Sequence, residues 1–113
     1  MSTNSNQNIF HKELIGRWDR LSIYEQMANI GAEIGRAINW RFRNGEISKN
    51  AFYRALELID FTVDDPKNKS RLKEILYVRE MLVDYFTGDN IYHSTAESWS
   101  KYFYYFNFAA RQR

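Results

Sequence analysis

Apolar residues recur at steps of three and four along most of the chain, which is the spacing of one face of an α-helix. The pattern predicts four helices, over about residues 23–43, 48–64, 65–88 and 94–110. No segment alternates in the manner of a strand. We therefore expect an all-α protein, most simply a four-helix up-down bundle, because short connections favour antiparallel neighbours.

Two pairs of residues have the spacing of a capping box, in which the side chains at the start of a helix bond reciprocally to the backbone. Ser22 and Glu25 form the first pair. Ser94 and Glu97 form the second, at the start of the last helix. Both helix starts are therefore expected to be fixed locally.

Other boundaries depend on single residues. Gly45 is expected to close the first helix and Ser48 to cap the second. Asp65 precedes Pro66 and is expected to cap the third helix, because proline is favoured at the first helical position. Gly88 is expected to end that helix.

The sequence predicts a short tail, a single domain and, at the start of that domain, a helical arm. Residues 1–9 are expected to form a disordered tail, and residues 10–113 a single domain. Within this domain, residues 10–20 are expected to form a short helical arm that packs Trp18 against the body.

The last predicted helix is unusually aromatic. Seven of the ten residues from 99 to 108 are aromatic, and at about 100° per residue their rings point to every side of the axis. One stripe suffices for the bundle core, and it consists of Trp99, Phe103, Phe106 and Ala110. Tyr104, Tyr105 and Phe108 point away from that stripe and require a cover. We expect them to form an interface.

Gly31 and Gly35 lie one turn apart inside the first helix, next to Ala28 and Ala32. An interior glycine costs roughly 1 kcal/mol relative to alanine, so close packing should offset it. An aromatic residue of the last helix could nest over these positions, and a ligand-facing notch is the alternative. We include both glycines in the predicted interface.

Arg79 occupies a position in the apolar stripe of the third helix. A buried guanidinium needs a partner, and the candidates on neighbouring helices are Glu33, Glu57 and Asp60. We expect a buried or half-buried ion pair that fixes the helix register. The alternatives are an anion-binding or substrate-binding arginine and a side chain that reaches solvent.

A cluster of basic residues surrounds an aromatic ring near the end of the first helix, and it consists of Arg36, Trp40, Arg41 and Arg43. Such a cluster could stack on the bases of a nucleic acid. The chain carries a net charge of only +2, which is too small for strong non-specific binding.

No motif for catalysis, metals or nucleotides stands out. The histidines are His11 and His93, and neither completes a Glu-x-x-His unit of a di-metal bundle. The chain of 113 residues has no cysteine and no apolar run long enough to span a membrane, and its polar first residues lead us to expect no signal peptide. We expect no cofactor, no metal, no membrane partner, no enzymatic activity and a cytoplasmic location.

Three stretches carry a resemblance: SIYEQMANIG at residues 22–31, DDPKNKSRLKEI at 64–75 and DYFTGDN at 84–90. They resemble a family of short uncharacterised helical proteins from anaerobic bacteria, over residues 18–111. The resemblance implies an all-helical cytosolic protein and no known activity.

The leading hypothesis is a non-enzymatic helical bundle that self-associates, most simply as a symmetric homodimer, through the aromatic helix. The alternative is a small nucleic-acid-associated subunit that uses the basic cluster.

Overall fold

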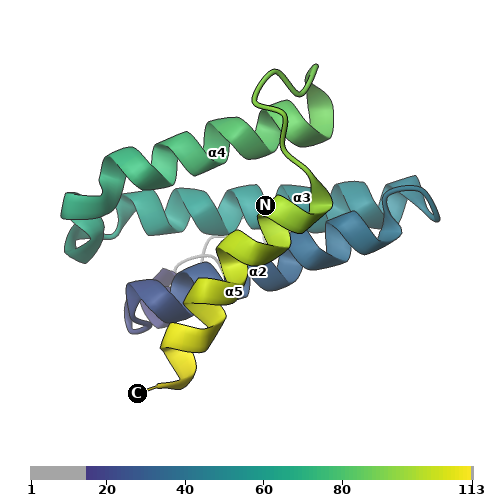
Figure 1. The fold of residues 1–113 in the computed structure, drawn as a ribbon. Coiled ribbons are helices and arrows are strands. Elements are labelled where there is room, and N and C mark those ends of the chain that lie inside the picture. The colour runs from purple at the N-terminus through teal and green to yellow at the C-terminus, as the bar shows by residue number, and fades with distance from the viewer. Residues whose placement is uncertain (1–14, 113) are drawn as a thin grey trace, which may run out of the picture.

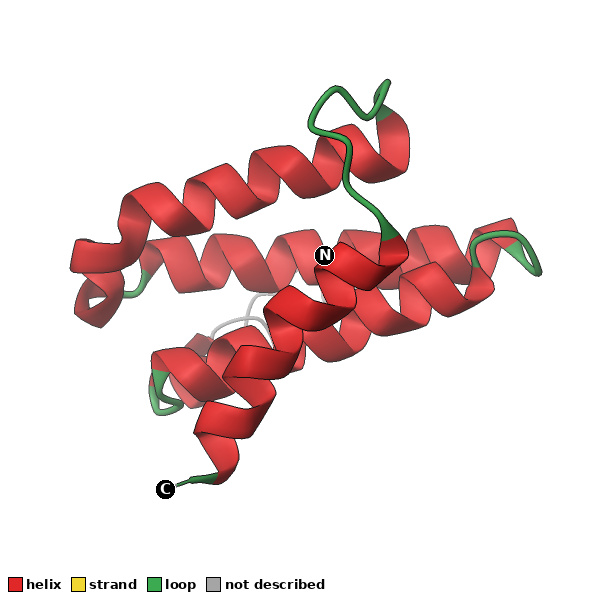
Figure 2. Ribbon diagram, in the orientation of Figure 1, coloured by secondary structure: helices red, strands yellow, loops and turns green. Residues whose placement is uncertain are grey.

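A computed structural model describes residues 15–112 of the chain, and every regular element in that range is helical. Residues 15–19 are helical. The longer elements follow in the order α2 (Ile23–Trp40), α3 (Gly45–Asp64), the 3₁₀ helix η1 (Pro66–Arg71), α4 (Leu72–Thr87) and α5 (Ala96–Arg111). The all-α prediction is confirmed (Figure 2). The predicted tail, residues 1–9, and the first part of the arm lie outside the described residues.

The helices pack in the spatial order α4, α3, α2, α5. Helices α2 and α3 lie antiparallel, and α4 returns along α3 (Figure 1). Helix α5 crosses α2 obliquely and ends beyond its N-terminal half (Figure 1). This crossing leaves one side of α5 outside the packed layer.

The core lies between these helices, and its fully buried members are apolar side chains from α2, α3 and α4, chiefly Met27, Ile30, Ile34, Ile59, Ile75 and Leu82. Trp99, Phe103 and Phe106 add the aromatic stripe of α5, which is buried as expected. Trp18 is buried too, so the described part of the arm packs against the body.

The first capping box is present, because Ser22 Oγ accepts from the Glu25 amide and the Glu25 carboxylate accepts from the Ser22 amide. The second capping box begins one residue later than predicted. Thr95 and Ser98 form the box of α5. The Asn90 side chain instead bonds the backbone of Ser94, which holds that residue in the preceding loop.

The predicted boundary between the first two helices was wrong. Helix α2 already ends at Trp40, and Asn44 caps α3 by accepting from the amides of Glu46 and Ile47. Gly45 is therefore the first residue of α3. Ser48 lies inside α3, where its buried hydroxyl donates to the Ala37 carbonyl at 2.6 Å and ties the two helices together.

Asp65 caps a helix as expected, but that helix is η1, and α4 begins only at Leu72. Pro66 takes the first position of η1. Gly88 ends α4 with an extended backbone, and its amide donates to the Asp84 carbonyl.

Candidate functional site

A groove of about 590 Å³ lies between α2 and α5. The wall from α2 carries mostly small or apolar side chains, namely Ala28, Gly31, Ala32, Ile34, Gly35 and Ile38. The wall from α5 is formed by Ala96, Glu97, Trp99, Ser100, Phe103, Tyr104 and Asn107. Three residues of the predicted interface, Gly31, Gly35 and Tyr104, therefore line the same groove.

The two glycines play different parts in this groove. A Cβ atom on Gly31 would lie 2.7 Å from the Cβ atom of Phe103, so the glycine allows α5 to approach α2. Gly35 is exposed, and a Cβ atom there would meet nothing within 4 Å. Packing inside the protein explains Gly31, whereas Gly35 leaves open space in the groove.

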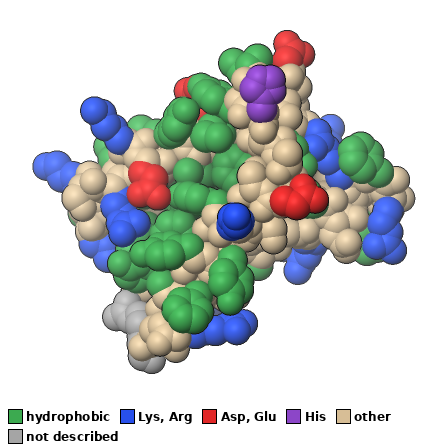
Figure 3. Space-filling model, viewed as in Figure 1, with side chains coloured by type: hydrophobic (Ala, Val, Ile, Leu, Met, Phe, Trp, Pro, Cys, Tyr) green, Lys and Arg blue, Asp and Glu red, His purple; other side chains and the backbone are tan. Residues whose placement is uncertain are grey.

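Three large aromatic rings are exposed on α5, and one of them, that of Tyr104, also lines the groove. Tyr104, Tyr105 and Phe108 are 66%, 55% and 52% exposed. The rings of Tyr104 and Phe108 stack with their centroids 6.4 Å apart. Hydrophobic side chains gather over the C-terminal half of α5 in Figure 3. The described fold thus leaves uncovered the three residues that the sequence indicated as surplus.

Arg79 forms an ion pair with Asp60, one of its three predicted partners. Its Nε atom lies 2.8 Å from one carboxylate oxygen of Asp60, and a terminal nitrogen lies 3.3 Å from the other. The two side chains are 36% and 54% exposed, so the pair lies at the surface between α3 and α4 and is at most half-buried. Glu57 is exposed on α3. Glu33 pairs instead with Arg36 and Arg54.

The exposure of this pair limits its effect on stability. An Arg79→Gln variant is expected to lower the free energy of unfolding by no more than about 1 kcal/mol, because solvent screens the attraction. Urea denaturation of this variant, of Asp60→Asn and of the double variant measures the coupling between the two side chains. A loss above about 3 kcal/mol for either single change would indicate a buried pair instead.

The basic cluster is largely engaged within the molecule. Arg41 donates to the Tyr85 carbonyl at 2.8 Å, and its guanidinium lies 4.5 Å from the centre of the Tyr85 ring. Arg43 lies over the ring of Trp40 at 4.8 Å. Arg36 pairs with a carboxylate on its own helix. Arg41 therefore links the end of α2 to α4 and is not free to bind a phosphate without breaking that link.

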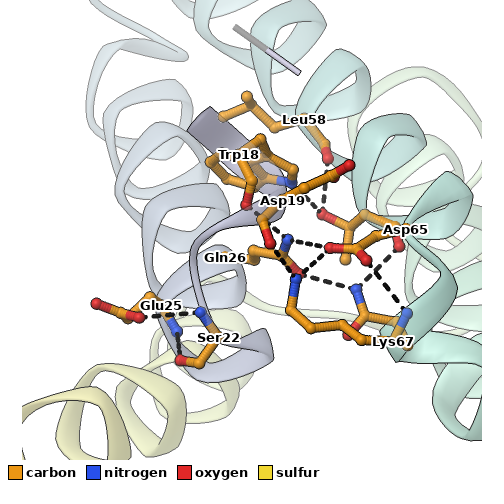
Figure 4. A network of polar contacts seen from close by, with 10 residues as sticks. Trp18, Asp19, Ser22, Glu25, Gln26, Leu58, Asp65 and Lys67 are labelled. Carbon is orange, nitrogen blue, oxygen red and sulfur yellow. Dashed lines mark hydrogen bonds and ion pairs between the residues drawn. The ribbon is translucent and has the colours of Figure 1, made fainter. Parts of the chain in front are cut away.

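A buried polar network, which the sequence analysis did not predict, joins the arm to α2, α3 and η1 (Figure 4). The side-chain amide of Gln26 donates to the Trp18 backbone carbonyl at 2.9 Å and to the Asp65 carboxylate at 2.8 Å. Asn68 donates to the Gln26 side-chain oxygen and to the Thr62 carbonyl. The Trp18 indole donates to the Thr62 hydroxyl at 3.0 Å. The polar position of Gln26, beside Met27 on the core-facing side of α2, was the available signal.

The carboxylate of Asp65 is the charged centre of this network. Burial alone would raise its pKa, but hydrogen bonds from Lys67 and Gln26 outweigh burial and hold the pKa of Asp65 below its ordinary value. Desolvation and the neighbouring Asp65 charge raise the pKa of Asp19. Lys67 also donates to the Asp19 backbone carbonyl. This arrangement keeps Asp65 ionised and orders the start of η1.

Two tyrosine hydroxyls donate to glutamates. Burial and the bond to Glu74 raise the pKa of Tyr102 well above its usual value. The bond to Glu80 raises the pKa of Tyr92 to about 12. Both hydroxyls therefore stay protonated at neutral pH, which is the wrong state for a general base or a nucleophile.

Within residues 15–112, no group of three or more histidine, cysteine or acidic side chains is placed to hold a metal ion. No helix in the same range is long and apolar enough to cross a membrane. The groove between α2 and α5, with the exposed rings of α5, is the candidate binding surface described above.

Comparisons with protein-family models, with curated proteins and with solved structures gave no match. The resemblance to proteins of anaerobic bacteria therefore stays a prediction.

Proposed function

We propose that this protein is a non-enzymatic helical protein that self-associates as a symmetric homodimer through α5 and the adjoining groove. One observation carries the proposal. Tyr104, Tyr105 and Phe108 are each more than half exposed on one helix, and Tyr104 also lines a groove whose opposite wall consists mostly of small residues. Large exposed apolar patches of this kind mark interaction sites in soluble proteins.

A second copy is the occupant that the chemistry of this surface favours. Tyrosine and phenylalanine are enriched at the centres of protein interfaces. A two-fold dimer brings the same patch of both copies together, so each copy covers the aromatic rings of the other. The small side chains of α2 would let the second backbone approach closely, as Gly31 already does for Phe103.

The nucleic-acid alternative has weaker support. It relies on Arg36, Trp40, Arg41 and Arg43, and the guanidinium of Arg41 is already bound to Tyr85. The net charge of +2 provides little long-range attraction for a phosphate backbone.

We also propose that the helices form a four-helix up-down bundle in the cytoplasm. Successive helices alternate in direction (Figure 1), which supports the topology. Tyr102 of α5 donates to Glu74 of α4 at 2.8 Å, so α5 also contacts α4.

Replacing Tyr104 by glutamate tests the proposed interface. Tyr104→Glu is expected to raise the dimer dissociation constant by about tenfold or more, because it places a charge in a desolvated aromatic contact. Phe108→Glu should act in the same direction. Light scattering coupled to size-exclusion chromatography measures the mass at each concentration.

Ile91→Glu is the matched control, because Ile91 is 68% exposed but lies in the loop before α5. It should leave the dissociation constant unchanged. Equal weakening by all three substitutions would show that α5 is not the interface.

A further inference from the structure

We propose that two copies pack their α5 helices antiparallel about a two-fold axis at Tyr104, which sets Glu97 of each copy against Arg111 of the other. This inference rests on the proposed self-association and specifies its register. It names which charges and which rings meet across the interface.

The residues concerned form one line along α5. Glu97, Ser100, Tyr104, Asn107 and Arg111 follow one another at steps of three and four, so they share one face of the helix. The first four of these residues line the groove. Arg111 continues the line at the exposed C-terminal end of α5. The second α5 helix would therefore lie along the groove and contact α2 as well.

The register follows from charge and size. A two-fold axis at Tyr104 pairs residues that are equally distant from it, so Glu97 meets Arg111 of the second copy. The same axis sets the large ring of Phe108 against the small side chain of Ser100. It also places Lys101 opposite the uncharged Asn107. The axis thus pairs opposite charges at its two ends and a large ring with a small side chain nearer its centre, and no like charges meet along the line.

Two other arrangements oppose like charges. A parallel pair of α5 helices would set Glu97 against Glu97 and Arg111 against Arg111 near a shared axis. An antiparallel pair centred at Lys101 would bring two lysines together. Like charges across an interface weaken association, so the axis at Tyr104 is favoured.

The charged ends of this line are available for such pairing. Glu97 and Arg111 are both exposed, and neither forms an ion pair with another residue of the described range. Along the groove, the small side chains of Ala28 and Ala32 and the bare backbone of Gly35 leave open space beside α5. Small residues at a helix contact allow the axes to approach to the short end of the usual range, about 8 Å.

A charge-swap series tests the register. Glu97→Arg and Arg111→Glu are each expected to raise the dimer dissociation constant about tenfold at low salt, because each turns two attractive contacts into two repulsive ones. The double variant should return to within about threefold of the wild-type value, because the pairs re-form with reversed charges. Analytical ultracentrifugation at low and high salt measures these constants, and high salt should reduce the effect of the single changes.

Glu46→Arg is the matched control, because Glu46 is an exposed glutamate in the first turn of α3, as Glu97 is in α5. It should not change the dissociation constant. Circular dichroism melts of all variants check that each remains folded.

Cross-linking provides a second readout. The chain has no cysteine, so Tyr104→Cys introduces a single thiol at the proposed axis. This variant should form an intermolecular disulfide faster than Tyr105→Cys, whose thiol lies off the line.

The outcomes separate the two proposals. A wild-type protein that stays monomeric overturns both, and another protein would then be the occupant of the groove. A wild-type dimer whose affinity is not restored by the double swap, or whose Tyr104→Cys variant cross-links no faster than Tyr105→Cys, overturns the register alone.

Discussion

A Gly31→Leu variant is expected to lose about 2–3 kcal/mol of unfolding free energy, because the new side chain would overlap the core. A Cβ atom on Gly31 would lie 2.7 Å from Cβ and 2.8 Å from Cγ of Phe103. Those atoms are near the backbone of α5, so the helix itself must shift. The loss is net of a gain of nearly 1 kcal/mol in helix propensity. Urea denaturation at one low protein concentration measures it.

Gly35→Leu is the control, one turn further along the same helix. A Cβ atom there meets nothing within 4 Å, so at a protein concentration where the chain is monomeric the same substitution should keep or slightly raise the free energy of unfolding. If the two variants are equally stable, then close approach of α5 is not what Gly31 provides.

An Asp65→Ala variant is expected to lose about 2–4 kcal/mol of unfolding free energy, which is the second large effect that we predict. Asp65 accepts from the buried Gln26 amide, caps η1 through the Lys67 amide and pairs with the Lys67 ammonium. Removing the carboxylate takes away one acceptor of a fully buried amide as well as the cap. Thermal and urea denaturation measure the change.

Asp64→Ala is the matched control, because Asp64 is the exposed neighbouring carboxylate at the end of α3. It should change the free energy of unfolding by less than about 0.5 kcal/mol. An equal loss in both variants would show that local helix effects, and not the buried network, explain the result.

The Asp65 carboxylate also determines how the stability of the fold changes with pH. The pKa of Asp65 is lower in the folded protein than its ordinary value of 3.8, so its contribution is fully present above that value. As the pH falls below 3.8, the unfolded chain takes up the proton first and stability is lost. The wild-type protein should therefore lose more stability in acid than Asp65→Ala does.

Periodicity and local signals predicted much of the fold. The all-helical class, the capping box at Ser22 and Glu25, the burial of Trp18 and the aromatic core stripe of α5 all followed from spacing. These features depend on residues close in sequence, or on one face of one helix. The chain itself therefore carries enough information to predict them.

Helix ends were harder to predict wherever several polar residues compete. Asn44, Gly45 and Ser48 could each mark a boundary, and the structure uses Asn44 because its side chain reaches two free amides. Asn90 likewise holds Ser94 in the loop, which leaves the cap to Thr95. Which residue caps the helix depends on the path of the preceding loop, and residue spacing alone does not reveal that path.

The buried network depends on tertiary contacts that no local pattern encodes. Gln26 and Asn68 are separated by 42 residues and meet only when η1 packs against α2. For the candidate site, the sequence indicated the surplus rings and the glycines separately. Only the oblique crossing of α5 showed that Gly31, Gly35 and Tyr104 line one groove. The packing of α4 on α3 showed that the Arg79 pair lies at the surface.

The central claim is that α5 joins two copies of this chain, and the mass of the wild-type protein in solution tests it most directly. Sedimentation of the 13.6 kDa chain across a dilution series should give a species of twice that mass at micromolar concentration, which dissociates on dilution. A mass of one chain at every concentration would contradict the account.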